Sequence, residues 1–169
     1  GANFYGLKVK GSDLGHLFFN KAGFAGPVDF RNASIRGNFE ANEARFTHTA
    51  RGATFKGLKV EGRALFDKVV LAGPVDMSDA NFFTLEIEAL NDSTSSLPSL
   101  DLSRTMIQRD LSITRTHFQA LLANALRVEG NTHLSDCTIT EIADLRYSRF
   151  LMLTLDVSRF METHAVMLE

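Results

Sequence analysis

The histidines of this chain are not arranged as metal ligands. The five are scattered along the sequence: His16, His48, His117, His133 and His164. No two of them have the His-x-His or His-x-x-x-His spacing that commonly brings two imidazoles onto one metal ion. His117 and His133 each stand directly before a position of the apolar repeat described below, so their side chains should point outward. We therefore predict solvated surface histidines and no metal site.

The single cysteine, Cys137, falls on an inward position of the same repeat, two residues before Ile139. A reactive thiol needs exposure and a lowered pKa, and nothing near Cys137 supplies either. We expect a small buried side chain with no catalytic role. A lone cysteine also excludes an intrachain disulfide framework and a cysteine-rich zinc site.

The carboxylates of the second half show no clear spacing along a coil: Asp101, Asp110, Asp136, Asp144 and Asp156. Enzymes that cleave glycosidic bonds use paired carboxylates on one face. An Asp or Asn directly before a repeat centre is better explained as a corner residue that hydrogen-bonds its own backbone. Phosphate loops, catalytic-serine motifs and dinucleotide fingerprints are absent from the sequence. We predict no catalytic, cofactor-binding or metal-ligating residue, no cofactor and no small-molecule substrate.

Arginines concentrate in the second half of the chain: Arg104, Arg109, Arg115, Arg127, Arg146, Arg149 and Arg159. Such a face could contact nucleic acid or an acidic partner. However, 18 Lys and Arg are interleaved with 20 Asp and Glu, and the formal net charge is −2. This balance predicts a mixed, solvated surface and makes no strong case for nucleic-acid binding.

The elements that must position these side chains follow an apolar repeat. An apolar residue recurs every five or six positions as far as Phe160, beginning with Phe4, Val9, Leu14, Phe19, Phe24, Phe30 and Ile35. A small or aliphatic residue stands two positions before each one. Neither a helical period nor strict alternation fits this spacing. Four such units can form one square coil of 20–22 residues whose centres point inward, stacked on the next coil at the spacing of neighbouring strands.

A longer repeat overlies the short one. The segment Gly6–Gly11 returns as Gly57–Gly62, and Gly26–Phe30 returns as Gly73–Met77, at offsets of 51 and 47 residues. We interpret this as an internal duplication of about two coils, with four extra residues in Ser12–His16. Glycines at the unit ends are expected to form corners with positive φ.

Three units, Ala2-Asn3-Phe4, Ala80-Asn81-Phe82 and Ala143-Asp144-Leu145, resemble the signature of the pentapeptide-repeat family, Ala-(Asp/Asn)-Leu-x-x. This resemblance implies a right-handed quadrilateral β-helix. We therefore predict an all-β fold: a right-handed, four-sided parallel β-helix of about seven coils. Residues 1–160 should form one domain, interrupted by a loop at about 88–99, and residues 161–169 a C-terminal cap or tail.

These observations favour a non-catalytic protein-interaction or scaffold module, expected to be a domain excised from a larger protein. Its partner should be a protein, and end-to-end stacking could form a homodimer. A carbohydrate-active β-helix enzyme and a structural spacer remain alternatives. The family resemblance adds a DNA mimic that binds gyrase, which the near-neutral charge and short tail disfavour. No apolar run is long enough to span a membrane. The compartment stays undetermined, with a preference for the cytoplasm.

Overall fold

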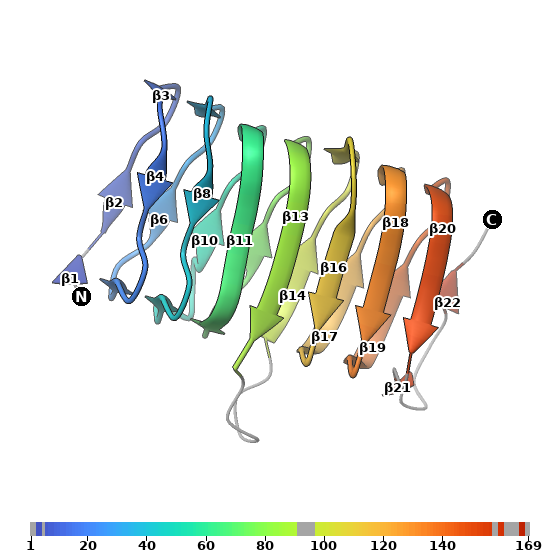
Figure 1. The fold of residues 1–169 in the computed structure, drawn as a ribbon. Helices are drawn as coiled ribbons and strands as arrows, with labels where there is room; N and C mark the ends of the chain where they lie inside the picture. The colour runs from blue at the N-terminus through green and yellow to red at the C-terminus, as the bar shows by residue number, and fades with distance from the viewer. Residues whose placement is uncertain (1–2, 5, 91–96, 157–158, 161–165, 168–169) are drawn as a thin grey trace.

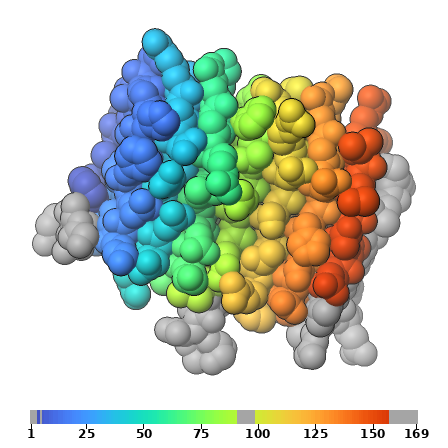
Figure 2. Space-filling model, viewed as in Figure 1, coloured from blue at the N-terminus to red at the C-terminus, as the bar shows by residue number. Residues whose placement is uncertain are grey.

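The structure is a computed structural model that describes residues 3–4, 6–90, 97–156, 159–160 and 166–167. These residues form parallel strands, with no helix among them, stacked as a β-solenoid of about six turns (Figure 1). The strand β1 (Asn3–Phe4) and the strand β22 (Val166–Met167) lie at opposite ends of the stack. The chain advances along the stack without returning, as the space-filling view shows (Figure 2). The predicted all-β parallel solenoid is therefore confirmed.

Four columns of strands form four sides, which we name A to D in chain order. Side A begins with β1, β5 (Gly23–Phe24) and β9 (Arg45–Phe46). Side B begins with β2 (Leu7–Lys8), β6 (Val28–Asp29), β10 (Ala53–Thr54) and β12 (Val75–Asp76). Side C begins with β3 (Asp13–Leu14) and β7 (Ser34–Ile35). Side D begins with β4 (Leu17–Phe18) and β8 (Phe39–Glu40).

Later strands are longer and turn corners. The strand β11 (Lys59–Leu71) passes from side C through side D to side A. Sides C and D then share β13 (Asn81–Ala89), β18 (Arg127–Ser135) and β20 (Arg149–Asp156), with β15 (Met106–Ile107) on side C and β16 (Leu111–Thr114) on side D. Sides A and B share β14 (Leu97–Asp101), β17 (His117–Leu122) and β19 (Thr138–Asp144), followed by β21 (Arg159–Phe160) and β22.

Coils differ in length more than the repeat suggests. On side B the in-register partners are Val28, Ala53, Val75, Leu100 and Leu121, so successive coils advance by 25, 22, 25 and 21 residues. The prediction of 20–22 residues for every coil is wrong, and the count is about six turns, where seven were expected. The extra residues lie in corners, one at 47–52 and one between β13 and β14, which lengthen a coil without adding a side.

Only one of the two long repeats has structural meaning. Val28 and Val75 both lie on side B, two coils apart, so Gly26–Phe30 and Gly73–Met77 are equivalent. By contrast, Leu7 lies on side B, whereas Lys59 of the matching segment lies on side C. The two Gly-Leu-Lys-Val segments are therefore displaced by one side, because the additional residues are at 47–52 and not at Ser12–His16.

The core is a continuous column of the predicted inward residues. Phe24 is 1% exposed and stacks between Phe4 and Phe46, with ring centroids 5.1 and 4.7 Å apart. At the weak unit near Glu40 the sizes are exchanged: Phe39 occupies the usual small position and Ala41 the centre, both fully buried. Aromatic rings fill the first half of the core, and aliphatic side chains fill most of the second. Burial of these columns supplies the main stabilisation of the stack.

Corners between sides B and C are four-residue turns with positive φ at the third residue, as in type II turns. At one such corner the Ala33 N–H donates to the Phe30 carbonyl at 3.1 Å, and Asn32 has φ 56°. The equivalent third residues form a column: Gly11, Asn32, Gly57, Asp79, Arg104, Ala125 and Tyr147. Most are not glycine, so the prediction that glycines would supply these corners is largely wrong. The N–H of each donates to a carbonyl of the next coil, which offsets the backbone strain.

The expected interruption and tail fall partly outside the described residues. The strand β13 continues to Ala89 and β14 begins at Leu97, so the solenoid is regular on both flanks of the predicted loop. Residues 91–96 lie outside the described part of the chain. In the predicted cap, Val166–Met167 forms β22, which pairs with Ala143–Asp144 on side B. Residues 161–165 and 168–169 are again outside the described part.

Candidate functional site

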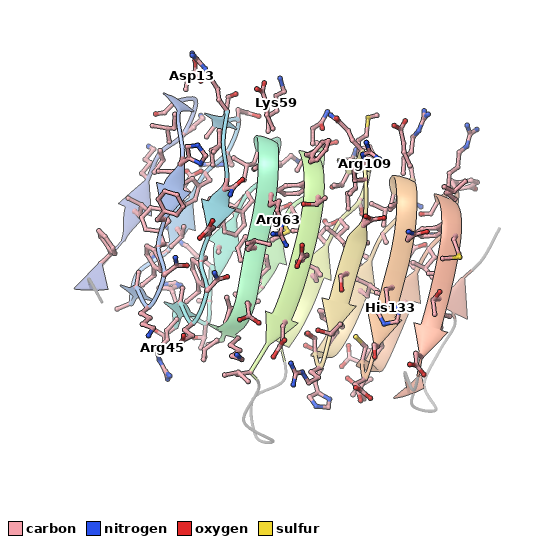
Figure 3. The ribbon with its side chains drawn as sticks, in the orientation of Figure 1. Asp13, Arg45, Lys59, Arg63, Arg109 and His133 are labelled. Carbon is pink, nitrogen blue, oxygen red and sulfur yellow. The ribbon has the colours of Figure 1, made fainter. Side chains whose placement is uncertain are left out.

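Side D is the broadest outer face of the solenoid. It is built from the long strands β11, β13, β16, β18 and β20, which face the viewer in Figure 1. Residues alternate along each strand, so burial of Ala64 and Phe66 turns Leu65 outward. The outward residues stand in register across five strands: Leu65, Glu86, Ser112, His133 and Thr154. Arg63 and His133 are on this face in Figure 3.

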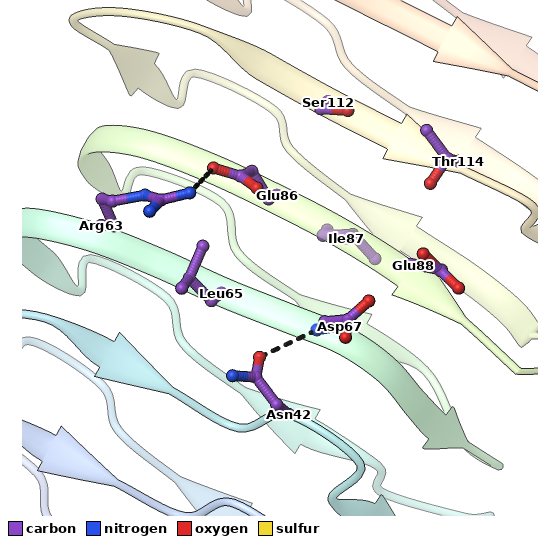
Figure 4. Close-up of a pocket in the computed structure, with 9 residues that line it drawn as sticks. All are labelled: Asn42, Arg63, Leu65, Asp67, Glu86, Ile87, Glu88, Ser112 and Thr114. Carbon is purple, nitrogen blue, oxygen red and sulfur yellow. Dashed lines mark hydrogen bonds and ion pairs between the residues drawn. The ribbon is translucent and has the colours of Figure 1, made fainter.

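An open groove of about 270 Å³ crosses side D between β11 and β16 (Figure 4). Its lining comes from four consecutive coils: Asn42, Arg63, Leu65, Asp67, Glu86, Ile87, Glu88, Ser112 and Thr114. The short side chains of Ser112 and Thr114 follow the longer Glu86 and Glu88 on the preceding strand. This change in side-chain length hollows an otherwise flat sheet. We call this hollow the side D groove.

Arginines engage the two glutamates of the side D groove. Arg63 donates from Nη2 to Glu86 Oε1 at 2.7 Å, and Arg115 Nη2 lies 2.6 Å from Glu88 Oε2. The Glu88 side chain is 13% exposed, and its Oε1 is buried without a hydrogen-bond partner among the described residues. At the end of the groove, the Asp67 N–H donates to Asn42 Oδ1 at 3.3 Å. The lining is thus polar, held in place and rich in acceptors.

Aspartates on side B serve the corners, as predicted. Each of four carboxylates accepts the N–H two residues later through Oδ1, at 2.8–3.1 Å: Asp29, Asp76, Asp101 and Asp144. These side chains are therefore turn caps. Hydrogen bonds from Arg31 and Arg146 hold the pKa of Asp29 and Asp144, respectively, below the usual range of a carboxyl group.

The other residues singled out in the sequence lie apart from the side D groove. Cys137 is 2% exposed, and burial raises the pKa of its thiol, as expected for an inert side chain. His117 is exposed on side A. Asp110 accepts the Asn131 N–H at 2.7 Å on the corner between sides C and D, and Asp136 has positive φ on the corner between D and A.

Arginines of the second half form ion pairs with neighbouring acids. Arg104 lies 2.6 Å from Asp79, Arg127 lies 3.0 Å from Glu129, and Arg146 lies 3.0 Å from Asp144. Acidic and basic side chains therefore alternate on this part of the surface. The mixed surface that the charge balance predicted is present, and these arginines do not form an uninterrupted basic face.

Sequence reasoning missed the acidic residues of the side D groove. Glu86 follows Leu65 by 21 residues, which is the length of one coil, and it stands in register with it. Glu88 is two residues further along the same outward face. The coil period was therefore the signal, but it had to be applied to outward positions of the first half.

The geometry defines the class of the protein as a four-sided parallel β-solenoid with a polar groove on one side. Comparison of the chain with protein-family models, curated proteins and solved structures finds no match. Within the described residues, no group of three or more His, Cys, Asp or Glu is placed to hold a metal ion. None of the described segments is a helix long and apolar enough to cross a membrane.

Proposed function

We propose that this solenoid is a non-catalytic protein-interaction module and that the side D groove is its docking surface. The observation that carries the proposal is the groove itself, a hollow in the broadest face whose polar side chains are fixed by neighbouring coils. A partner segment could lie across the strands, with its polar groups on Ser112, Thr114 and the groove carboxylates and an apolar side chain on Leu65. A rigid lining lowers the conformational entropy lost on binding.

The proposal extends to the family. Three features support a degenerate pentapeptide-repeat protein: four-sided coils, inward residues at a centre and two positions before it, and aspartates that cap the corners. The Ala-Asn-Phe unit at 80–82 matches the family signature and places Ala80 and Phe82 in the core. Longer coils and phenylalanine at most centres of the first half distinguish this chain from regular members.

A face-specific double variant tests the docking surface. Ser112→Arg with Thr114→Arg should fill the side D groove, because two long cationic side chains replace two short ones. Thr138→Arg with Thr140→Arg makes the same change on one strand of side A and serves as the matched control. The measurement is quantitative mass spectrometry of proteins retained from a lysate of the source organism.

The expected result is a set of proteins that the wild type and the side A variant retain and the side D variant loses. Equal retention by both variants would contradict the proposal. So would a wild type that retains nothing above an empty resin. Far-UV circular dichroism of each variant should first confirm an unchanged β spectrum.

One observation favours a second function, a carbohydrate-active enzyme. Asp67, Glu86 and Glu88 share the side D groove, and paired carboxylates on one face are what glycoside cleavage needs. The arginines on Glu86 and Glu88 favour binding over proton transfer. Release of reducing ends from a panel of polysaccharides, abolished in Glu88→Gln, would establish the enzyme. A wild type inactive on every polysaccharide would exclude it for those substrates.

A further inference from the structure

A second hollow lies on side B at the first three coils, on the opposite side of the solenoid from the side D groove. Its volume is about 400 Å³, and we call it the side B groove. Leu7 and Pro27 contribute apolar surface, and Lys8, Arg31 and Arg51 contribute cations. Asp29 is the only acid in the lining. Gly6 belongs to the lining as well, and its missing side chain leaves part of the hollow open.

The backbone around the side B groove is fixed by contacts between coils. The Leu7 N–H donates to the Pro27 carbonyl at 3.3 Å, and the Val28 N–H donates to the Gly52 carbonyl at 3.4 Å. The Ala53 N–H donates to the Pro74 carbonyl at 3.0 Å. The hollow is therefore a permanent feature of the stack and requires no rearrangement before it can accept a ligand.

Two of the three cations in this groove have no counterion within the described part of the chain. Arg31 donates to both carboxylate oxygens of Asp29, from Nε at 3.0 Å and from Nη2 at 2.7 Å, so this pair is neutral. The side chains of Lys8 and Arg51 are exposed, and neither lies within ion-pair distance of a described acid. The lining thus has an excess of two positive charges in a protein whose net charge is −2.

The positive region is short. Lys8 stands in one in-register outward column with Asp29, Thr54, Asp76 and Asp101. A long polyanion following the solenoid axis would leave Lys8 and meet the carboxylates of Asp76 and Asp101. Repulsion between like charges penalises that arrangement. The column therefore selects a short anionic ligand and disfavours an extended nucleic acid.

We propose that the side B groove docks a short acidic segment of a partner protein, with one or two carboxylates next to an apolar side chain. The carboxylates bind Lys8 and Arg51, and a guanidinium can accept a carboxylate through two parallel hydrogen bonds. The apolar side chain packs on Leu7 and Pro27. This site is independent of the side D groove, so the chain would hold two partner segments on opposite sides.

Fluorescence polarisation with a labelled peptide of sequence Gly-Glu-Glu-Leu-Glu-Gly tests the site. A peptide with Gln in place of each Glu removes the charge, and a single-stranded oligonucleotide of equal charge represents nucleic acid. Lys8→Glu with Arg51→Glu should weaken peptide binding by at least about tenfold, because attraction becomes repulsion. Arg45→Glu with Arg149→Glu makes the same charge change away from the groove and should leave affinity within about twofold.

Chemical-shift mapping of the bound peptide locates it. The expected shifts cluster at Leu7–Lys8, Val28–Asp29 and Ala53–Thr54, and the side D variant Ser112→Arg with Thr114→Arg retains them. Failure of the side D proposal therefore leaves this result unchanged. Equal affinity for the Glu and Gln peptides, equal weakening by both charge reversals, or tighter binding of the oligonucleotide would each overturn the proposal, as would no binding of the peptide.

Discussion

At the scale of single residues, the structure separates side chains that the repeat treats alike. Phe24 and Phe150 are both repeat centres, and the sequence predicts that Asp at either position would severely destabilise the fold. Phe24 is 1% exposed and has phenylalanine rings stacked on both sides. Phe150 lies in the last coil of sides C and D and is only partly buried. Position in the stack, which no local pattern contains, decides the difference.

We predict that Phe24→Ala lowers the free energy of unfolding by about 3–5 kcal/mol, because it removes a buried ring and leaves a cavity. Phe150→Ala should cost clearly less, since its ring already contacts solvent. Urea unfolding followed by circular dichroism measures both. Equal losses would show that burial in the stack does not set the contribution of a repeat centre.

Polar residues also have structural roles that follow from the stack. The carbonyl oxygen Oδ1 of Asn38 accepts the N–H of Arg63, and that of Asn42 accepts the N–H of Asp67, each one coil further along. Asn38 in turn donates its own N–H to His16 Nδ1 at 3.0 Å. These side chains satisfy backbone donors where the chain turns between sides. Their chemistry is used for corners, as it is for the aspartates of side B.

At the scale of elements, the corners set the lengths of the coils and the residues that can occupy them. Gly52 has φ 53°, and a Cβ built on it would overlap the carbonyl oxygen of Pro74 on the next coil. Both the backbone conformation and the close approach therefore require glycine here. Gly15 stands at another corner, has no positive φ, and a Cβ there would meet nothing within 4 Å.

Gly52→Ala is expected to destabilise the protein by at least about 2 kcal/mol, from backbone strain and the clash with Pro74. Gly15→Ala is the matched control and should be neutral or slightly stabilising, because it restricts the unfolded chain. Thermal unfolding of both variants provides the comparison. A Gly52→Ala protein as stable as the wild type would mean that this corner can move away from Pro74.

At the scale of the whole molecule, charge is balanced locally. Acids on several sides have arginine or lysine neighbours, and hydrogen bonds from arginine hold the pKa of Asp13, Asp29, Asp79 and Asp144 below the usual range. The described surface therefore does not present the continuous negative charge of a nucleic-acid mimic. Local balance favours docking surfaces that are small and defined by unpaired groups, such as Lys8 and Arg51.

The lowered pKa values make stability depend on acid pH. A carboxyl whose folded pKa lies below its unfolded value of about 3.9 stabilises the fold above that pH, and this contribution is lost as pH falls through the folded pKa. Asp29→Asn with Asp144→Asn removes two such groups while keeping an oxygen that can accept the turn N–H. The variant should be less stable than the wild type at pH 7, with the difference shrinking below about pH 4. Urea midpoints at pH 7 and pH 3 measure it, and a constant difference would refute the linkage.

The sequence by itself determined the class of fold and most of its core. A five-residue apolar period fits neither a helix nor an ordinary strand, so burial of its centres permits little besides a solenoid, and the buried residues from Phe24 to Leu145 follow that period. It also identified Cys137 as buried and the aspartates as corner residues, because inward and outward positions follow from the same period.

The tertiary structure alone decided how the sides align. Corner residues at 47–52 shift the phase of everything after them, and this moved Lys59 to side C and reduced the number of turns. The two grooves depend on that alignment, since Glu86 faces Arg63 and Lys8 shares a hollow with Arg51 only through pairing between coils. Apolar spacing determines which residues face inward. The lengths of the corners determine which outward residues become neighbours, and candidate binding sites are made of those neighbours.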